Sequence, residues 1–262
     1  MDATHVVENQ PPEFAPRDLW RDDAALREAL AREGGGAFSD VVARYGALAG
    51  GELLELSHDM HRDRPRLRSH DAAGNRIDQV AFHPSYHRVM ELAIAHGVAG
   101  LSWARPEPGA HVARAALAYL HYQAEPGTSC PLTMTHAAVP VLRQAPALRE
   151  WADRVAACRY DPRDVAIAGK PGVTLGMGMT EKQGGSDVRA NATVATPTGD
   201  GAYALVGHKW FMSAPMSDGF LVLAQAPGGL TCLLMPRRLP DGGRNAFALM
   251  WLKDRLRRTN IW

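Results

Sequence analysis

The apolar residues change their spacing near residue 170, and this change limits the folds that the chain can adopt. Before about Arg159, apolar residues recur every three or four positions, which is the period of one helix face. The clearest run is Tyr86, Val89, Met90, Ala93 and Ile94. Pro84 stands just inside the expected start of this run and Gly97 at its expected end, so the sequence predicts a helix between them.

Three further runs predict helices in the same region. One predicted face joins Leu19, Leu26 and Leu30. A second, which ends before Pro126, consists of Val112, Ala115, Ala116, Tyr119 and Leu120. A third helix is expected to open at Pro131, with Ser129 or Cys130 near its cap.

Beyond Gly172 the apolar runs become short and are separated by turn residues. The predicted strands are Val173 to Leu175, Asn191 to Thr196, Tyr203 to Ser213, Phe220 to Ala226 and Leu230 to Met235. Closely spaced strands of this kind favour a small antiparallel sheet or barrel. Because the helices precede the strands without βαβ alternation, the chain is predicted to be an α+β protein and not a Rossmann domain.

One stretch among the predicted helices, Arg62 to Val80, has no apolar period. It contains Pro65, several arginines and the pair Gly74-Asn75. The sequence therefore predicts a long loop here that packs across a neighbouring surface.

The most informative segment is the glycine-rich stretch 177–188, which reads Met-Gly-Met-Thr-Glu-Lys-Gln-Gly-Gly-Ser-Asp-Val. Glycines allow backbone N–H groups to approach a phosphate, and the hydroxyls of Thr180 and Ser186 can donate hydrogen bonds beside them. Taken alone, such a stretch is more often an ordinary turn. It is not a dinucleotide-binding fingerprint, because Glu181 stands where G-x-G-x-x-G has its third glycine.

A second segment follows at residues 206–214, which read Val-Gly-His-Lys-Trp-Phe-Met-Ser-Ala. An aromatic pair and a hydroxyl on one strand could line a flat ring from one side. Without the glycine-rich stretch, Phe211 and Met212 would be interpreted as ordinary core residues.

Together the two segments resemble the acyl-CoA dehydrogenases, whose middle β-domain carries a T-E-x-x-x-G-S-D loop followed by a G-x-K-x-W-I-T strand. The forms present here, with Ser129 to Thr135 and Leu239 to Gly242, resemble the AidB-like branch, named for the adaptive response to alkylation. The resemblance runs over nearly the whole chain. It implies an N-terminal all-helical domain over residues 1–170, followed by a partial antiparallel β-barrel domain over residues 171–262.

The resemblance also implies FAD as the cofactor and assigns residues to its site. The residues expected to bind FAD are Met177, Gly178, Met179, Thr180, Glu181, Lys182, Gln183, Gly184, Gly185, Ser186, Phe211, Met212 and Ser213. Thr180 would bond the edge of the isoalloxazine ring, and Ser186 would bond the FAD pyrophosphate or an acyl-thioester substrate. Phe211 stands where many relatives have tryptophan, and Ser213 would offer its hydroxyl toward the flavin N5 side.

In the family reaction, a carboxylate removes an α-proton from an acyl thioester while the β-hydride passes to the flavin. The chain is therefore expected to be an oxidoreductase. Its end, residues 252–262, departs from the family pattern, since relatives continue into a C-terminal helical bundle that carries the base region. With this bundle absent, no catalytic residue is assigned, and little or no dehydrogenase activity is expected.

Two other functions stay open. The chain could be a non-enzymatic protein that binds flavin and protects DNA, or an inactive pseudogene fragment. By resemblance, the expected partner is an acyl-CoA-like small molecule. The family forms homo-oligomers, but most of their interface is expected to be missing from this chain. Weak or no DNA binding is expected, because relatives bind DNA through the C-terminal region.

Several other polar residues were weighed as site residues. The same resemblance puts Thr133 and Thr135 near the flavin ring. His83 and His87 have the i, i+4 spacing of two metal ligands, but no third ligand is evident, so no metal is predicted. His61, with its neighbour His58, is interpreted as an exposed loop residue.

Three carboxylates could serve as a general base: Glu125, Glu181 and Asp187. The motif makes Glu181 and Asp187 loop-shaping residues, through bonds to backbone N–H groups. Hydrolysis is not expected, because the chain has no G-x-S-x-G elbow and Ser186 has no evident histidine partner.

The bulk properties are those of a globular chain. A net charge of +1 gives no global attraction to nucleic acid or membranes. No run reaches the roughly 18 apolar residues of a membrane helix, and the start of the chain lacks the pattern of a signal peptide. Three cysteines without a C-x-x-C pair fit a cytoplasmic protein.

Overall fold

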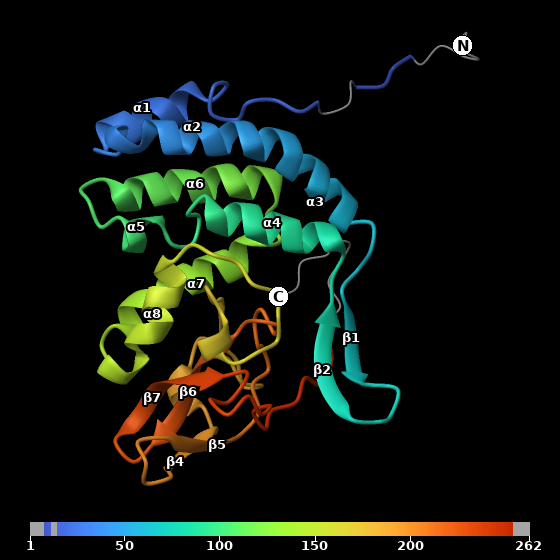
Figure 1. The fold of residues 1–262 in the computed structure, drawn as a ribbon, viewed down its shortest axis with the longest axis vertical. Helices are drawn as coiled ribbons and strands as arrows, with labels where there is room; N and C mark the ends of the chain where they lie inside the picture. The colour runs from blue at the N-terminus through green and yellow to red at the C-terminus, as the bar shows by residue number, and fades with distance from the viewer. Residues whose placement is uncertain (1–7, 12–14, 254–262) are drawn as a thin grey trace.

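The structure, a computed structural model, describes residues 8–11 and 15–253. A layer of helices packs on a mixed β-sheet, and a two-stranded hairpin extends beside both (Figure 1). Within the described ranges every α-helix precedes the first strand of that sheet, so the predicted α+β order is confirmed. The expectations for residues 1–7, 12–14 and 254–262 lie outside the described residues.

The helical layer begins at Ala24 and is built from short to medium helices. The α-helices are α1 (Ala24–Arg32), α2 (Ser39–Leu48), α3 (Leu54–Met60), α4 (Pro84–Ala95), α5 (Leu101–Ala104), α6 (Ala110–Ala124), α7 (Ser129–Leu142) and α8 (Arg149–Ala156). Short helical turns are η1 (Gly36–Phe38), η2 (Ala49–Leu53), η3 (Pro146–Leu148), η4 (Ile167–Gly169) and η5 (Val188–Ala190). None of these helices, which cover only the described residues, has the length and apolar character that crossing a membrane requires.

Helix α4 follows the predicted pattern closely. It starts at Pro84, and all five residues of the predicted run are buried. The run therefore identifies both the helix and the face that it turns to the core.

The buried face of α6 differs from the predicted one. Tyr119 is 51% exposed, whereas Ala113, Leu117 and Ala124 are buried together with Leu120. The helix is rich in alanine, so more than one stripe of residues has an apolar pattern. The large leucine side chains determine which stripe faces the core, because they bury the most apolar area.

The sheet contains five strands. These are β3 (Leu175–Gly178), β4 (Val194–Pro197), β5 (Tyr203–Val206), β6 (Gly219–Ala226) and β7 (Gly229–Pro236). The expected antiparallel pairing is present between β4 and β5 and between β6 and β7. Strands β3 and β6 run parallel, with Leu175 opposite Gly219, because residues 179–218 return the chain to the end of the sheet where β3 began.

The helices and the sheet share one apolar interface. Val139 and Leu142 of α7 and Trp151 of α8 belong to one buried cluster with Leu175 of β3 and Leu221 of β6. All five side chains are at most 8% exposed. Burial of such large side chains on both sides is the main force that holds the sheet against the helices.

A hydroxyl adds a polar contact to this interface. Thr135 of α7 is buried, and its Oγ1 accepts a hydrogen bond of 3.0 Å from the backbone N–H of Leu175. The carbonyl oxygen of Leu175 lies 3.4 Å from the same hydroxyl. Helix α7 thus satisfies backbone groups at the start of β3 that would otherwise be buried without a partner.

The predicted loop between Arg62 and Val80 is wrong. The chain instead forms an antiparallel hairpin of β1 (Arg66–His70) and β2 (Arg76–Ala81). The carboxylate of Asp71 accepts backbone hydrogen bonds from Ala73 and Asn75, and Gly74 takes a left-handed conformation with φ 84°. The strand β1 was not predicted because its sequence, Arg-Leu-Arg-Ser-His, does not alternate between apolar and polar residues.

A buried arginine ties the hairpin to the sheet. Arg237, which follows β7, is 4% exposed and donates to the carbonyl oxygens of Asp78 at 2.9 Å and Pro215 at 2.8 Å. Its Nε lies 3.2 Å from the carboxylate of Asp164. Arg244 donates to the carboxylate of Asp78 at 2.5 Å. Residues far apart in the sequence thereby meet at Asp78, in the middle of β2.

We predict that Thr135→Val destabilises the chain by about 1–3 kcal/mol, because it leaves the buried N–H of Leu175 without its acceptor. Thr133→Val on the same helix is the matched control, since Thr133 is exposed and such a change normally stays within about 0.5 kcal/mol. Urea unfolding of both variants measures the difference. Equal stabilities would show that the hydroxyl of Thr135 contributes nothing to docking.

Candidate functional site

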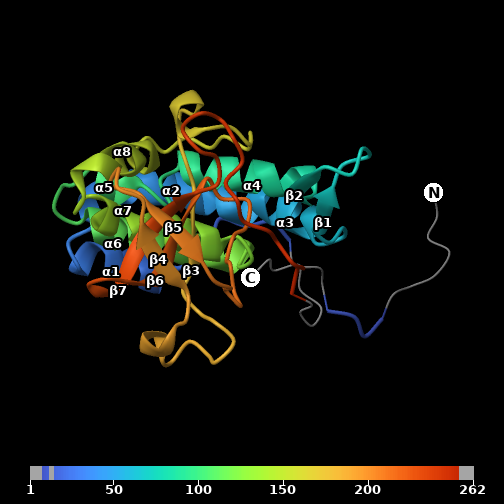
Figure 2. The ribbon, with the colours of Figure 1, turned by 90° about the horizontal axis from the view of Figure 1, so that it is seen from below.

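The glycine-rich stretch leaves the sheet at the end of β3. Its residues 179–193 form a loop with one helical turn, η5, and Figure 2 shows this gold-coloured loop projecting from the body of the molecule. Gly185 and Ser186 are exposed, and Thr180 is half-buried. The loop therefore carries its hydroxyls and glycines at the surface.

The second predicted segment lies directly against the first. The backbone N–H of Trp210 donates to the carbonyl oxygen of Thr180 at 2.9 Å, and that of Ser213 donates to Met177 at 3.0 Å. The structure thus brings together two segments that the sequence could only associate by resemblance.

The strand predicted to continue to Ser213 ends at Val206 instead. Only one isolated bridge, between Met177 and Ser213, remains of the expected strand pairing. Ala214 has a left-handed backbone, with φ 53°, and turns the chain away after the bridge. Phe211 and Met212 therefore lie on an irregular segment.

Glycines make this close approach possible. A Cβ atom on Gly176 would lie 2.4 Å from the carbonyl oxygen of Ser213 and 2.7 Å from the ring of Phe220. A Cβ on Gly178 would lie 3.0 Å from the sulfur of Met212. Larger residues at these positions would push the two segments apart.

An ion pair between Glu181 and Lys209 also joins the two segments, in addition to their backbone contacts. Lys209 Nζ lies 2.7 Å from Glu181 Oε1, and the two side chains are 5% and 8% exposed. The carboxylate also accepts hydrogen bonds from Ala192 N at 2.7 Å, Thr193 N at 3.0 Å and Thr193 Oγ1 at 2.5 Å. Glu181 thus shapes the loop through backbone N–H groups, as predicted.

The bonds around Glu181 determine its protonation. Burial disfavours the charged carboxylate, but the hydrogen bonds from Lys209, Thr193 and the backbone outweigh it and lower the pKa of Glu181 from 4.5 to about 2. The group is therefore ionised at neutral pH, but it is a weak base, because its pKa is low and four donors already occupy its oxygens.

The side chain of Glu125, the second candidate base, is also engaged in hydrogen bonds, whereas within the described residues that of Asp187 is not. Glu125 is fully buried and accepts from Ser57 at 2.6 Å and His61 at 2.8 Å. His61 is thus bound to a buried group and is not the exposed loop residue that was expected. Asp187 is exposed, and as the residue before η5 it makes no side-chain capping bond, so its expected loop-shaping bond is not formed there.

Asn191 braces the loop from inside. Its side chain donates to the carbonyl oxygen of Met179 at 2.8 Å and accepts from the side chain of Gln183 at 2.9 Å. The side chain of Gln183 is therefore directed toward Asn191. Asn191 is not among the predicted site residues, although an asparagine just after a glycine-rich stretch is a typical turn-stabilising residue.

Aromatic side chains gather beside the second segment. Trp210 is 40% exposed and meets the edge of Trp251, with ring centroids 5.4 Å apart. Lys182 lies 5.5 Å from the centre of the Trp210 ring, and Lys253 lies 4.5 Å from that of Phe211. Trp251 and Lys253 were not predicted, because only folding brings residues near 250 beside residues near 210.

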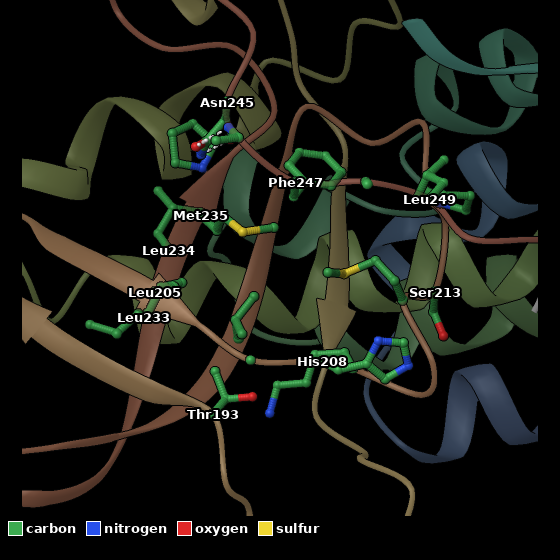
Figure 3. Close-up of a pocket in the computed structure, with 18 of the residues that line it drawn as sticks. Thr193, Leu205, His208, Ser213, Leu233, Leu234, Met235, Asn245, Phe247 and Leu249 are labelled. Carbon is green, nitrogen blue, oxygen red and sulfur yellow. Dashed lines mark hydrogen bonds between the residues drawn. The ribbon is translucent and has the colours of Figure 1, made fainter. Parts of the chain in front are cut away.

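A cavity of about 1270 Å³ opens on one side of the second segment. Figure 3 shows it between the sheet and the segment that ends the described chain, with Leu205, Met235 and Phe247 around it. Phe211, Met212 and Ser213 line this cavity, whereas residues 177–186 do not. Its volume is above the roughly 300–1,000 Å³ that is typical of small-molecule pockets.

Three hydroxyl donors lie on the two segments, and one of them, that of Ser213, lines the cavity. Within the described part of the chain, the hydroxyls of Thr180, Ser186 and Ser213 form no hydrogen bond with other residues, and all three are at least partly exposed. Hydroxyl donors beside an aromatic ring fit a heteroaromatic group that carries carbonyl and phosphate oxygens.

Thr133 and Thr135 take different positions from those expected. Thr135 is buried and engaged with Leu175, so it does not offer its hydroxyl to a ligand. Thr133 is exposed on the opposite face of α7.

The two histidines with the spacing of metal ligands, His83 and His87, bond other residues. The His83 side chain accepts from the N–H of Ser85 at the start of α4, and His87 bonds the hydroxyl of Tyr160 at 2.8 Å. Across the described residues, no group of three or more histidine, cysteine or acidic side chains is arranged to hold a metal.

Two family models match the chain. Residues 9–162 match the adaptive response protein AidB N-terminal domain, and residues 176–246 match the acyl-CoA dehydrogenase middle domain. The chain is 48% identical over 258 residues to "Putative acyl-CoA dehydrogenase AidB" of Escherichia coli (strain K12). It is 27% identical over 248 residues to acyl-CoA dehydrogenase family member 11 of Caenorhabditis elegans.

The chain spans about half the length of these relatives. The match covers 97% of the chain but 48% of the E. coli protein, and 89% of the chain but 40% of the C. elegans protein. Among solved structures, C. elegans ACDH-11 in complex with C11-CoA superposes with a TM-score of 0.80 and 25% identity, covering 96% of this chain and 45% of that one. The apo-form of Bd2924 superposes with a TM-score of 0.79 and 25% identity, covering 94% and 51%.

We predict that the contribution of Glu181 to stability depends on pH. Its pKa is lower in the folded chain, so its stabilising effect is complete above its ordinary pKa of 4.5 and is lost as the pH falls toward about 2. At pH 7, Glu181→Gln should reduce the free energy of unfolding by roughly 3–5 kcal/mol, the usual effect of breaking a buried pair. Denaturant unfolding should show this difference shrinking between pH 4.5 and pH 3. A difference that does not change with pH would contradict the lowered pKa.

Proposed function

Because the chain belongs to the acyl-CoA dehydrogenase family, within its AidB group, we propose that residues 177–186 and 211–213 form one side of an FAD-binding site. The observation that carries this proposal is the backbone pairing of the two segments, Trp210 to Thr180 and Ser213 to Met177. FAD, when bound, supplies the redox chemistry, while the protein orients it and its substrate.

Different side chains of the two segments would contact different parts of FAD. Phe211 and Met212 present an apolar surface to the isoalloxazine ring, beside the cavity that they line. Thr180 and Ser213 offer hydroxyls to the polar edge of the ring. Ser186, at the exposed tip of the loop, is available to a pyrophosphate or to the thioester end of a ligand. Glu181 belongs to the support of the site and not to its contact surface.

The reaction class that fits the family is oxidation of an acyl thioester between its α and β carbons. The complex of ACDH-11 with C11-CoA supports an acyl-CoA as the ligand class. Glu125 and Glu181 are both buried and hydrogen-bonded, so neither is available as the base of that reaction. We therefore expect the 262-residue chain to bind flavin with little or no dehydrogenase turnover.

The remaining expectations extend this proposal to the whole protein. The boundary near residue 170 divides a helical domain from a flavin-binding β-domain. For the whole protein we propose self-association and a part in the response to DNA alkylation, by resemblance to AidB, and a cytoplasmic location, which the three cysteines without a C-x-x-C pair favour. Salt-sensitive binding of duplex DNA would favour the alternative, a protective protein that is not an enzyme.

The experiment is a visible spectrum of the purified chain after incubation with FAD and removal of free FAD by desalting. Retained flavin absorption, with the resolved bands of a ring in an apolar site, is expected. A colourless protein with an intact circular dichroism spectrum would reject the FAD site. Addition of acyl-CoA with an electron-accepting dye then measures turnover separately.

We predict that Phe211→Leu weakens FAD binding roughly tenfold, since a stacked aromatic ring contributes about 0.5–1.5 kcal/mol beyond its buried area. Tyr122→Leu is the control, because Tyr122 is a 63% exposed aromatic residue on α6 and lies outside both segments. FAD titration followed by flavin fluorescence gives both dissociation constants. Equal weakening in the two variants would exclude a direct contact of Phe211 with the ring.

A further inference from the structure

Resting on the FAD site proposed above, we propose that Glu181 and Lys209 are positioning residues for the flavin. Their buried ion pair would set the distance between Thr180 on one segment and Phe211 on the other. Neither charged group would touch the ring. They would act through the backbone of the residues next to them in the sequence.

The position of the pair in the chain supports this role. Glu181 directly follows Thr180, whose carbonyl oxygen receives the N–H of Trp210. Lys209 directly precedes Trp210 and lies two residues before Phe211. The ion pair of 2.7 Å and the backbone bond of 2.9 Å therefore link the same two short stretches of chain, one through side chains and the other through main chain.

Glu181 also connects a third segment. Its carboxylate accepts two backbone N–H groups and one hydroxyl from Ala192 and Thr193, at the entrance to β4. With the ammonium group of Lys209, four donors from two segments converge on one carboxylate. Each donor is directional, so the carboxylate has one position in which all four bonds form.

The free energy of folding alone does not explain why a buried ion pair stands at this position. Removing two charges from water costs several kcal/mol, and well-packed apolar residues of similar size are often as stable or more so. What apolar residues do not supply is a single register, because their contacts are not directional. The ion pair lies where the spacing of the two segments decides whether a flat ring fits.

A second buried ion pair provides a matched comparison. Lys170 bonds the carboxylate of Asp218, which also accepts from Thr174 N at 2.8 Å, just before β3 begins. Lys170 and Asp218 are 2% and 11% exposed, close to the values of the first pair. The two pairs therefore lie at opposite ends of β3. The Lys170–Asp218 pair lies where the strand starts, and the Glu181–Lys209 pair lies beyond its last residue, beside the flavin segments.

The test compares Glu181→Gln and Lys209→Met with Asp218→Asn in the full 262-residue chain. FAD titration gives the affinity, and hydrogen exchange gives the local opening at the amides of Trp210 and Ser213. Glu181→Gln and Lys209→Met should each weaken FAD at least tenfold and speed exchange at Trp210 at least tenfold beyond any change in the amides of α4. Asp218→Asn should speed exchange throughout and leave the FAD affinity of the folded protein within about threefold.

Each result decides one of the two proposals. Unchanged FAD affinity and unchanged Trp210 exchange in both pair variants would overturn the positioning role. Exchange that rises equally at Trp210 and in α4 would also overturn it, because the pair would then serve only global stability. A wild-type chain that binds no FAD would reject the FAD site, while exchange at Trp210 would still decide whether the ion pair holds the segments together.

Discussion

The enclosure of β3 between α7 and β6 is the contact on which the rest of the structure depends. The strand has only four residues, from Leu175 to Gly178. A strand of this length is not stable alone, so its backbone bonds to β6 and the side chain of Thr135 must form together. The glycine-rich loop begins where this strand ends, so the position of the loop follows from the packing of the helical layer.

The elements with a strong period were predictable from sequence. Helix α4 was predicted with its start and its buried face, and β6 and β7 were predicted within a residue of their bounds. Helix α6 was predicted with a different face, because alanine fits a core or a surface equally well. The hairpin was missed, since its arginines hide the alternation and its stability comes from Arg237 and Arg244, far along the chain.

The site was predictable in part and for a different reason. Its two segments were selected by resemblance to known motifs, not by any physical period, and the structure brings them into backbone contact. The irregular path of residues 207–213 could not be predicted, because it depends on Gly176 and on the turn at Ala214. Trp251 and Lys253 depend on tertiary folding in the same way.

The contacts of Asp78 with Arg237 and Arg244 have a consequence for the order in which the protein folds. Arg237 bonds the carbonyl oxygen of Asp78 across 159 residues of sequence, and Arg244 bonds the Asp78 carboxylate across 166. During synthesis the ribosome must therefore release nearly the entire described chain before the hairpin gains its partners. Until then the helical layer can fold by local contacts while the hairpin edge stays open to other chains. A late-closing contact of this kind makes the interval of synthesis between Asp78 and Arg244 the period of greatest aggregation risk.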